Sequence, residues 1–210
     1  MNLAELKYIY STMNNGKSLK LLTKNHQYLR QNKKTMLFTS ANDTRNGLIL
    51  PTDTKGIITT RIGLEAEAFL IERVDFFELV KREVPDIVLV DETELMKKKI
   101  IEDLSRIVDE LSVSVTCYGI LTDFQMKFFE GSETLLRLAD VKEELETECH
   151  FCNRNAIVNM RLINGIPVFG GEQFQIGDSY LAVCRACFMS EKAKALEAMQ
   201  NRRQFKKIEV

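Results

Sequence analysis

Three groups of residues in this 210-residue chain have the types and spacing that could support chemistry. The first is the run 11–18, which ends in Gly16-Lys17-Ser18. The second is the adjacent carboxylate pair Asp91 and Glu92. The third is two Cys-x-x-Cys pairs, at 149–152 and 184–187. These groups suggest phosphate binding, magnesium binding with proton transfer, and zinc binding.

The run 11–18 follows a short β-rich stretch and precedes a helical pattern, which is the layout of a phosphate-binding loop. Backbone N–H groups of such a turn and of the helix N-terminus converge on phosphate oxygens. We expect Lys17 to lie over the outer phosphates and the Ser18 hydroxyl to ligate Mg²⁺. The strict pattern has Gly where this chain has Ser11. The loop can still form, because Asn14 and Asn15 tolerate a left-handed backbone better than most residues other than glycine. An ordinary strand-to-helix turn is the alternative. The candidate loop comprises Ser11, Thr12, Met13, Asn14, Asn15, Gly16, Lys17 and Ser18.

The carboxylate pair follows four consecutive branched apolar residues, 87–90. Such a run predicts a strand that is buried on both faces of a parallel sheet. The carboxyl ends of these strands are where open α/β sheets bind ligands. In proteins with a phosphate-binding loop the aspartate holds Mg²⁺, so we assign that role to Asp91, and Glu92 is placed to act as a base. An acidic turn that caps the next helix is the alternative.

The paired cysteines indicate a metal site, because a reducing compartment disfavours disulfides. Four thiolates suit tetrahedral Zn²⁺ and leave no vacant position, so the site is predicted to be structural. The proposed ligands are Cys149, Cys152, Cys184 and Cys187. A redox role is disfavoured because there are two pairs and neither is expected to open a helix as in thioredoxin. Cys117, which stands alone, is predicted to be a small buried hydrophobe.

The surrounding pattern predicts the elements that position these residues. A strand near 8–10, a helix over 18–32 and a strand over 35–39 make a β–α–β start and therefore a parallel sheet. Further elements share the same alternation of apolar strand and amphipathic helix: a strand at 69–71, a helix at 75–83, a strand at 87–90, a helix at 97–112 and a strand at 113–121. We predict an α/β nucleotide-binding domain over residues 1–145.

Two segments stay ambiguous when they are taken from the residues alone. Residues 42–63 are rich in Asn, Asp, Thr and Gly and predict a long loop, with a hairpin as an option. Asp43, Arg45 and Arg61 could serve a phosphate or metal site, and a solvated loop fits equally well. Phe124 follows a predicted strand end, where it could stack on a base or pack in the core.

The α/β pattern stops near residue 146. Predicted strands over 156–162 and 166–169 flank Asn164-Gly165, which is a hairpin signal. The segment between the cysteine pairs exceeds the usual spacing of about 15–20 residues, so an extra loop lies inside a zinc ribbon over 146–190. A helical tail over 191–210 follows, beginning near Ser190.

Composition limits the class of protein. Hydrophobic residues make up 45% of the chain, charged residues 28%, and the formal net charge is −1. This balance fits a globular domain and argues against nonspecific binding of nucleic acid. No apolar run approaches the roughly 20 residues of a membrane helix. The N-terminal residues lack a signal-peptide pattern, so we expect a cytoplasmic protein.

Taken in order, these motifs resemble the zinc-bearing type II thymidine kinases in their bacterial form. The resemblance covers roughly residues 7–188. It rests on Ser-Thr-Met-Asn-Asn-Gly-Lys-Ser at 11–18, Asp-Thr-Arg at 43–45, Thr-Arg-Ile-Gly at 60–63, Val-Asp-Glu at 90–92, Cys-Tyr-Gly at 117–119, Thr-Asp-Phe at 122–124 and the two cysteine pairs.

The resemblance implies ATP-dependent transfer of the γ-phosphoryl group, with Mg²⁺, to the 5′-hydroxyl of thymidine, giving thymidine monophosphate for DNA synthesis. It also implies a homotetramer and feedback inhibition by thymidine triphosphate. Lys17 and Ser18 would bind phosphates and Mg²⁺, Asp91 would help hold the metal, and Glu92 would be the base for the hydroxyl.

The resemblance also implies roles around the nucleoside. Phe124 would lie against the base, and Asp43 and Arg45 would border the phosphates. A lasso loop between the cysteine pairs would close over the nucleoside, its backbone reading the thymine edge. The lasso includes Gln175, Ile176, Gly177, Asp178 and Tyr180.

Two departures from the family pattern affect base recognition. After Asp-Glu the family usually has x-Gln-Phe-Phe, whereas this chain has Thr93-Glu94-Leu95-Met96, which removes an aromatic wall and adds a charge near the nucleoside. The lasso is about two residues short. Two other functions remain as alternatives: a different ATPase with the same phosphate loop, and a non-catalytic nucleotide-binding regulator on the same fold.

Overall fold

The structure, a computed structural model, describes residues 4–43, 49–50, 52–173 and 179–197, and the backbone of 198–208. The chain divides into two compact units, which are treated separately below. The first consists of Met1–Leu121 and Phe128–Leu145, and the second of Thr122–Lys127 and Glu146–Val210.

The first unit is built on a seven-stranded sheet with the strand order β3-β4-β2-β5-β6-β1-β7. Six of these strands run parallel to one another: β1, β2, β4, β5, β6 and β7. The edge strand β3 pairs antiparallel with β4. The strands are β1 (Leu6–Ser11), β2 (Thr35–Thr39), β3 (Lys55–Thr59), β4 (Glu65–Leu70), β5 (Ile87–Val90), β6 (Ser114–Ile120) and β7 (Val141–Glu144). The predicted α/β fold with a mostly parallel central sheet is confirmed.

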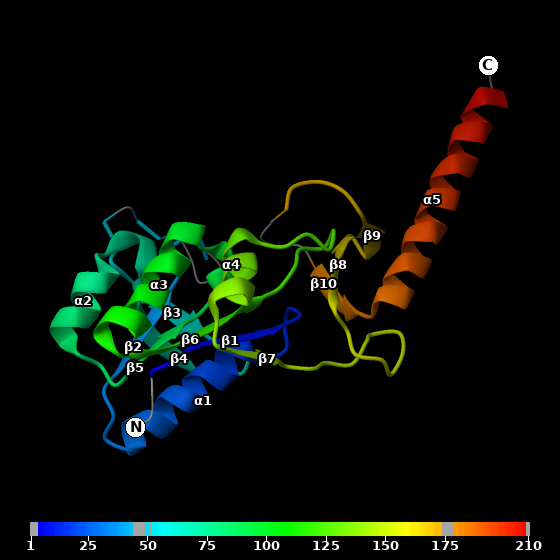
Figure 1. The fold of residues 1–210 in the computed structure, drawn as a ribbon. Helices are drawn as coiled ribbons and strands as arrows, with labels where there is room; N and C mark the ends of the chain where they lie inside the picture. The colour runs from blue at the N-terminus through cyan, green and yellow to red at the C-terminus, as the bar shows by residue number, and fades with distance from the viewer. Residues whose placement is uncertain (1–3, 44–48, 51, 174–178, 209–210) are drawn as a thin grey trace. The chain divides into compact units, whose positions relative to one another are not determined.

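Helices cover both faces of this sheet (Figure 1). α1 (Lys17–Arg30) packs on one face, where Leu21 and Leu22 join a buried cluster with residues of β1, β2 and β5. α2 (Phe76–Glu83), α3 (Lys98–Leu111) and α4 (Glu130–Leu138) lie on the other face, over a larger buried cluster. Two short 3₁₀ helices, η1 (Ile71–Arg73) and η2 (Thr93–Leu95), follow β4 and β5.

The amino-acid pattern explains the central elements. All four residues of β5, the run Ile-Val-Leu-Val, are buried, as expected for a strand between two helical layers. α3 buries Ile101, Leu104, Ile107 and Val108, which recur at helical spacing. The region expected to be a long loop contains β3, which forms a hairpin with β4. α4 and β7 were not among the predicted elements.

The second unit contains a three-stranded antiparallel sheet with the order β10-β8-β9. Its elements are β8 (Val158–Ile163), β9 (Ile166–Val168), β10 (Ser179–Val183) and the helix α5 (Arg185–Ile208). Asn164 and Gly165 have φ values of 51° and 75°, so the predicted hairpin turn between β8 and β9 is present. The C-terminal helix begins at Arg185 rather than near Ser190.

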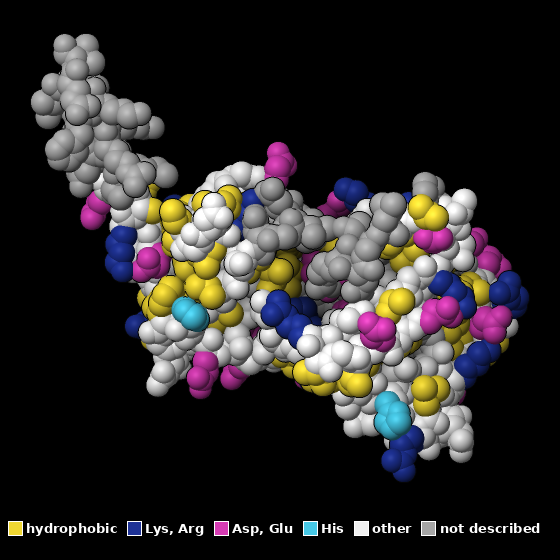
Figure 2. Space-filling model, turned by 180° about the vertical axis from the view of Figure 1, so that it is seen from behind, with side chains coloured by type: hydrophobic (Ala, Val, Ile, Leu, Met, Phe, Trp, Pro, Cys, Tyr) yellow, Lys and Arg dark blue, Asp and Glu magenta, His cyan; other side chains and the backbone are white. Residues whose placement is uncertain are grey.

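This unit has a small core that includes two of the cysteines, Val158, Met160 and Phe188. Several large apolar side chains of this unit are exposed: Phe151, Ile157, Ile163, Ile166 and Met189. Figure 2 shows hydrophobic side chains at the surface on the face that it draws. A single small core gives a unit of this size limited stability, and a structural metal is one of the means by which small domains add to it. Among the described residues, no helix combines the length and apolar character needed to cross a membrane.

Candidate functional site

The carboxyl ends of four parallel strands bring the candidate phosphate residues to one edge of the sheet. β1 ends at Ser11, β2 at Thr39, β5 at Val90 and β6 at Ile120. The candidate loop follows β1, and the Asp91–Glu92 pair follows β5. β6 lies between these two strands in the sheet. The topology therefore places both motifs at the edge where open α/β sheets bind ligands.

The loop after β1 has the backbone of a tight turn into α1. Asn14 and Gly16 have φ values of 64° and 71°, in the left-handed region. A Cβ at Gly16 would meet nothing within 4 Å, so the conformation rather than space favours glycine here. Lys17 is buried, and its Nζ donates to Ser11 Oγ at 3.3 Å and to the Thr12 carbonyl at 2.9 Å.

Two further features of this loop are compatible with phosphate binding. Asn15 Nδ2 donates to the Leu145 carbonyl at 2.6 Å, which ties the loop to the chain after β7. The buried Thr12 Oγ1 has no hydrogen-bond partner among the described residues. Since buried hydroxyls are normally hydrogen-bonded, this one suits a ligand in the loop. The first N–H groups of α1 and the Lys17 ammonium supply the positive potential that an anion needs.

The turn after β5, which carries Asp91 and Glu92, departs from regular strand geometry. Asp91 is 2% exposed, and its N–H donates to the Phe38 carbonyl of β2 at 2.9 Å. Glu92 is half-buried and adopts a left-handed backbone, φ 52° and ψ 42°, at the start of η2. Thr93 Oγ1 donates to the Tyr118 carbonyl of β6 at 3.0 Å and holds this turn in place. The left-handed backbone of Glu92 therefore ends the regular strand geometry of β5.

Glu94, where the sequence adds an acidic residue to the family pattern, is buried. Its side chain is 5% exposed within η2. Burial raises the pKa of Glu94 well above its usual range, and the neighbouring Glu92 raises it further. The buried position therefore favours a protonated carboxyl group rather than a carboxylate.

The segment after β2 carries Asp43, whose N–H donates to the Ser40 carbonyl at 3.2 Å. Glu72 of η1 holds this turn, since its carboxylate accepts from Ser40 Oγ at 2.6 Å and from the Ala41 N–H at 2.7 Å. This anchoring role could not be predicted from the sequence, because Glu72 is distant from the turn along the chain. Arg45 lies outside the described residues.

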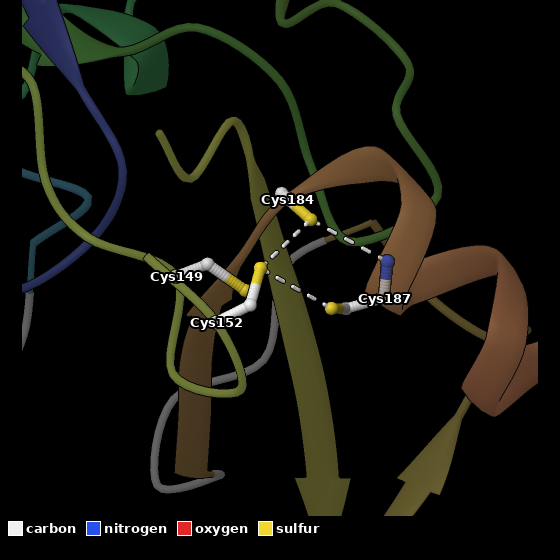
Figure 3. Close-up of side chains that lie close together, drawn as sticks. All are labelled: Cys149, Cys152, Cys184 and Cys187. Atoms are coloured by element: carbon white, nitrogen blue, oxygen red, sulfur yellow. Dashed lines mark hydrogen bonds between the residues drawn. The ribbon is translucent and has the colours of Figure 1, made fainter. Parts of the chain in front are cut away.

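The four predicted zinc ligands converge in the second unit. Their sulfur atoms lie within 4.8 Å of one another, and Cys152 Sγ is 3.7 Å from the sulfurs of both Cys184 and Cys187. Figure 3 shows the four thiols pointing to a common centre. Tetrahedral zinc with Zn–S bonds of about 2.3 Å places its sulfurs about 3.8 Å apart. The cluster therefore fits zinc with four thiolate ligands.

Backbone N–H groups lower the pKa of two of the four thiols. Burial raises the pKa of Cys149, but hydrogen bonds from the backbone, beginning with that of Cys184, outweigh this and lower it to about 6. The Cys187 N–H, 3.5 Å from Cys184 Sγ, lowers the pKa of Cys184. The second pair does open a helix, α5, contrary to the sequence-based expectation. The convergence of all four thiols nevertheless favours metal over redox chemistry.

Phe124 lies in the second unit, in the segment 122–127. Asp123 Oδ1 accepts from the N–H groups of Gln125 and Lys127 at 2.8 and 2.9 Å, which closes a compact turn. The Phe124 ring is 1% exposed, with the Arg161 guanidinium carbon 5.1 Å from its centroid. This contact has the geometry of a cation–π interaction.

The contacts of this segment come from polar residues on β8 that sequence reasoning missed. Arg161 and Asn159 are both buried, and Asn159 Nδ2 donates to the Thr122 carbonyl at 3.3 Å. They alternate with Val158 and Met160 of the ribbon core. In a sequence this alternation resembles a solvated strand face, so the pattern alone hides their buried role. Tyr180 is half-buried on β10, opposite Arg161. Gln175, Ile176, Gly177 and Asp178 lie outside the described residues.

A groove of about 610 Å³ lies elsewhere in the first unit. It is lined by residues at the amino ends of the parallel strands, including Glu5, Ile87 and Ser114, and by Lys24 of α1. Because Ser11 and Asp91 are at the opposite, carboxyl ends, this groove is separate from the candidate phosphate site.

Comparison with known proteins matches the thymidine kinase family model to residues 4–188. A thymidine kinase of Streptococcus pyogenes serotype M3 (strain ATCC BAA-595 / MGAS315) is 42% identical over 188 residues, which cover 87% of this chain and 96% of the relative. A thymidine kinase of Lactococcus lactis subsp. lactis (strain IL1403) is 43% identical with the same coverage. That of Streptococcus gordonii is 42% identical, covering 87% of this chain and 95% of the relative.

A solved structure described as a DNA replication initiation factor has a TM-score of 0.38 and 10% identity, covering 69% of this chain and 40% of that one. A likeness at this level supports no functional comparison. The family model and the relatives in contrast span nearly all of the two units up to the beginning of α5. The chain belongs to the thymidine kinase family.

Proposed function

We propose that the protein transfers the γ-phosphoryl group of ATP to the 5′-hydroxyl of thymidine. The observation that carries this proposal is the occurrence of the Lys17 loop and the Asp91–Glu92 turn at the carboxyl edge of one sheet. Phosphoryl transfer needs mainly positioning and stabilisation of charge. A buried lysine, a helix N-terminus and two carboxylates supply these functions.

The loop 11–18 is proposed to bind the ATP phosphates. Its backbone N–H groups would bind the phosphate oxygens, with Lys17 at the outer phosphates. The Ser18 hydroxyl and the Asp91 carboxylate would hold Mg²⁺, which would neutralise charge on the phosphates. Asp43, and Arg45 on the resemblance alone, are assigned to the border of the phosphate site.

Glu92 is proposed to be the base for the acceptor hydroxyl. As the 5′-oxygen forms its bond to the γ-phosphorus, the bond from that phosphorus to the oxygen shared with the β-phosphate breaks and ADP leaves. The hydroxyl proton passes to a Glu92 oxygen. The half-buried Glu92 is in a turn anchored by Thr93, which supports a defined position for this carboxylate.

The second unit is proposed to bind the nucleoside. Phe124 and Tyr180 are assigned to thymidine, and Gln175, Ile176, Gly177 and Asp178 to the lasso that reads thymine, on the strength of the resemblance. The buried contacts of Phe124 with Arg161 support a rigid ring there. Zinc on the four cysteines would hold this unit together without taking part in the reaction.

Further assignments rest on the family resemblance. They are a homotetramer, feedback inhibition by thymidine triphosphate, and a division of the chain at 145 and 190 into nucleotide-binding domain, zinc ribbon and helical tail.

The proposal is tested with ATP labelled at the γ-phosphate and three acceptor conditions: thymidine, deoxyuridine and none. We expect label in thymidine monophosphate and little release of phosphate without an acceptor. Phosphate release that does not depend on a nucleoside would instead identify a different ATPase. ATP and thymidine binding without any transfer would identify a non-catalytic nucleotide-binding regulator.

A further inference from the structure

Arg161 is a buried arginine of the second unit to which the proposed reaction gives no part. It lies on β8, the central strand of the three-stranded sheet, and is 3% exposed. Val158 and Met160 of the same strand belong to the ribbon core. Because side chains alternate along a strand, Asn159 and Arg161 are on the opposite face of the sheet. Arginine is almost never buried unless its polar groups have partners, so the contacts of Arg161 on this face define its role.

The first of these contacts is with the ring of Phe124. The guanidinium carbon lies over the ring, 5.1 Å from its centroid, and the ring is 1% exposed. Attraction between a cation and an aromatic face is strongest when both are removed from water. The turn that carries Phe124 is also held by β8, because Asn159 Nδ2 donates to the Thr122 carbonyl at 3.3 Å. Two side chains of β8 therefore fix the position of this ring.

The second contact is with the chain that leads to the predicted lasso. Arg161 Nη1 donates to the Glu172 carbonyl at 3.4 Å. The neighbouring Gly171 is equally close, since a Cβ there would lie 3.6 Å from the same nitrogen. From the turn that carries Phe124, Gln125 Nε2 donates to the Gly171 carbonyl at 2.9 Å. Residues 171–172 are thus tied both to Arg161 and to this turn.

Tyr180 of β10 is next to Arg161 in the sheet. The two residues are directly opposite each other in the antiparallel ladder between β8 and β10, so their side chains leave the sheet on the same face. Tyr180 is half-buried there. Arg161 therefore lies among three parts of the second unit that are assigned to the nucleoside: the Phe124 ring, Tyr180 and the chain that enters the lasso.

We propose that Arg161 is a positioning residue for nucleoside binding, whose guanidinium group fixes both the Phe124 ring and, through the Glu172 carbonyl, the start of the lasso. This inference rests on the proposed function, in which Phe124 and the lasso bind thymidine. A guanidinium group suits the role because it offers a flat face to a ring and N–H donors at its edge. Groups that are held in place before thymidine arrives lose less entropy when it binds.

Two substitutions of Arg161 test this role. Arg161→Met keeps a long side chain without charge or donor, and Arg161→Lys keeps the charge without the flat face. We expect Arg161→Met to raise KM for thymidine by about tenfold or more, the size of a desolvated cation–π contact. Arg161→Lys should raise it by about fivefold or more, because lysine does not replace arginine at a stacked site. KM for MgATP should stay within about threefold of the parent, since only one substrate loses binding.

A double-mutant cycle with Phe124→Leu asks whether Arg161 acts through the ring. Phe124→Leu keeps an apolar side chain but removes the aromatic face. In that background Arg161→Met should raise KM for thymidine by at most about threefold, since the two changes remove a shared contact. Arg154→Met, the same change at an exposed arginine of the second unit, is the control and should keep parental kinetics.

Loss of fold is separated from loss of positioning by thermal unfolding and zinc content, measured for each variant against the parent. A purely structural role would lower the active fraction, and so kcat, at an unchanged KM for thymidine. If Arg161→Met does not fold, the smaller change Arg161→Lys decides the test.

Three results would overturn the inference: a parental KM for thymidine in either Arg161 variant that folds, an equal rise of KM for thymidine and MgATP, or multiplicative effects in the double variant. Any of these in a parent that phosphorylates thymidine rejects the role of Arg161 and leaves the proposed function intact. Failure of the parent to phosphorylate thymidine rejects the function itself, and the inference with it.

Discussion

At the scale of single residues, the candidate phosphate loop 11–18 already holds Lys17 in place. The Lys17 ammonium donates to one side-chain and one carbonyl oxygen of the loop, both close to the start of the turn. Its side chain is 8% exposed. An ammonium fixed in this way loses little side-chain entropy when phosphate oxygens bind. Lys17 therefore combines charge with a preset position.

Replacing Lys17 by alanine should impair both ATP binding and turnover, because its charge offsets phosphate charge in the ground state and in the transition state. We expect kcat/KM for MgATP to fall by at least about a hundredfold, or about 2.7 kcal/mol. Steady-state kinetics and direct ATP binding measure this. Lys24→Ala, an exposed lysine on the same helix, is the control. Near-parental kinetics for Lys17→Ala would show that residues 11–18 do not bind phosphate.

At the scale of elements, α4 packs closely against the turn that carries Glu92. A Cβ at Gly131, in the first turn of α4, would lie 2.2 Å from the Thr93 carbonyl oxygen and 2.9 Å from that of Met96. Both neighbours are backbone atoms, which cannot rotate away. Ser132 Oγ also donates to the Ile120 carbonyl at the end of β6, at 2.6 Å. The helix thus supports the turn that carries Glu92 through close backbone contact.

Gly131→Ala should therefore destabilise the protein and displace η2. Overpacking of this kind costs about 1–3 kcal/mol, which for a domain of this size lowers Tm by several degrees. Thermal unfolding and kcat are the measurements, and both should fall. Gly170→Ala is the control, since a Cβ there would meet nothing within 4 Å. A Gly131→Ala protein with parental Tm and turnover would mean that this close packing is not required.

The candidate site could be predicted as far as its residues are close in sequence. Gly16-Lys17-Ser18, the buried run before Asp91 and the paired cysteines are local patterns with a direct physical meaning. Gly131 and Glu72 act on segments distant along the chain, so their roles depend on tertiary packing. The burial of Glu94 is likewise a tertiary feature, which the polar sequence around it conceals.

At the scale of the whole molecule, the two units have separate hydrophobic cores. The core of the first is extensive, with buried residues from strands and helices on both faces of the sheet. That of the second is small and includes the candidate metal-binding thiols themselves. A structural zinc can supply about 10–16 kcal/mol of folding free energy in small domains. The second unit should therefore depend on metal far more than the first.

Removal of zinc should selectively unfold the second unit. We expect one zinc per chain in the purified protein. A zinc-selective chelator should increase hydrogen exchange over residues 149–187 and abolish thymidine binding, while exchange in β1, β5 and β6 changes little. Mass spectrometry and metal analysis measure these effects.

Two cysteine variants provide matched controls for this experiment. Cys184→Ser should lose zinc, whereas Cys117→Ala, which removes a buried thiol of β6 outside the cluster, should retain it. Active protein with less than half an equivalent of zinc would contradict the structural role of the metal.

The most direct test of the central claim is the turnover of Glu92→Gln, with ATP and thymidine binding measured in parallel. This change keeps the shape and hydrogen-bonding reach of the side chain but removes its basic oxygen. General-base assistance typically contributes about 10²–10⁴-fold. The account predicts that turnover falls by about two orders of magnitude or more while both substrates still bind. A Glu92→Gln enzyme within about tenfold of the parental rate would contradict the assignment of Glu92 as the base.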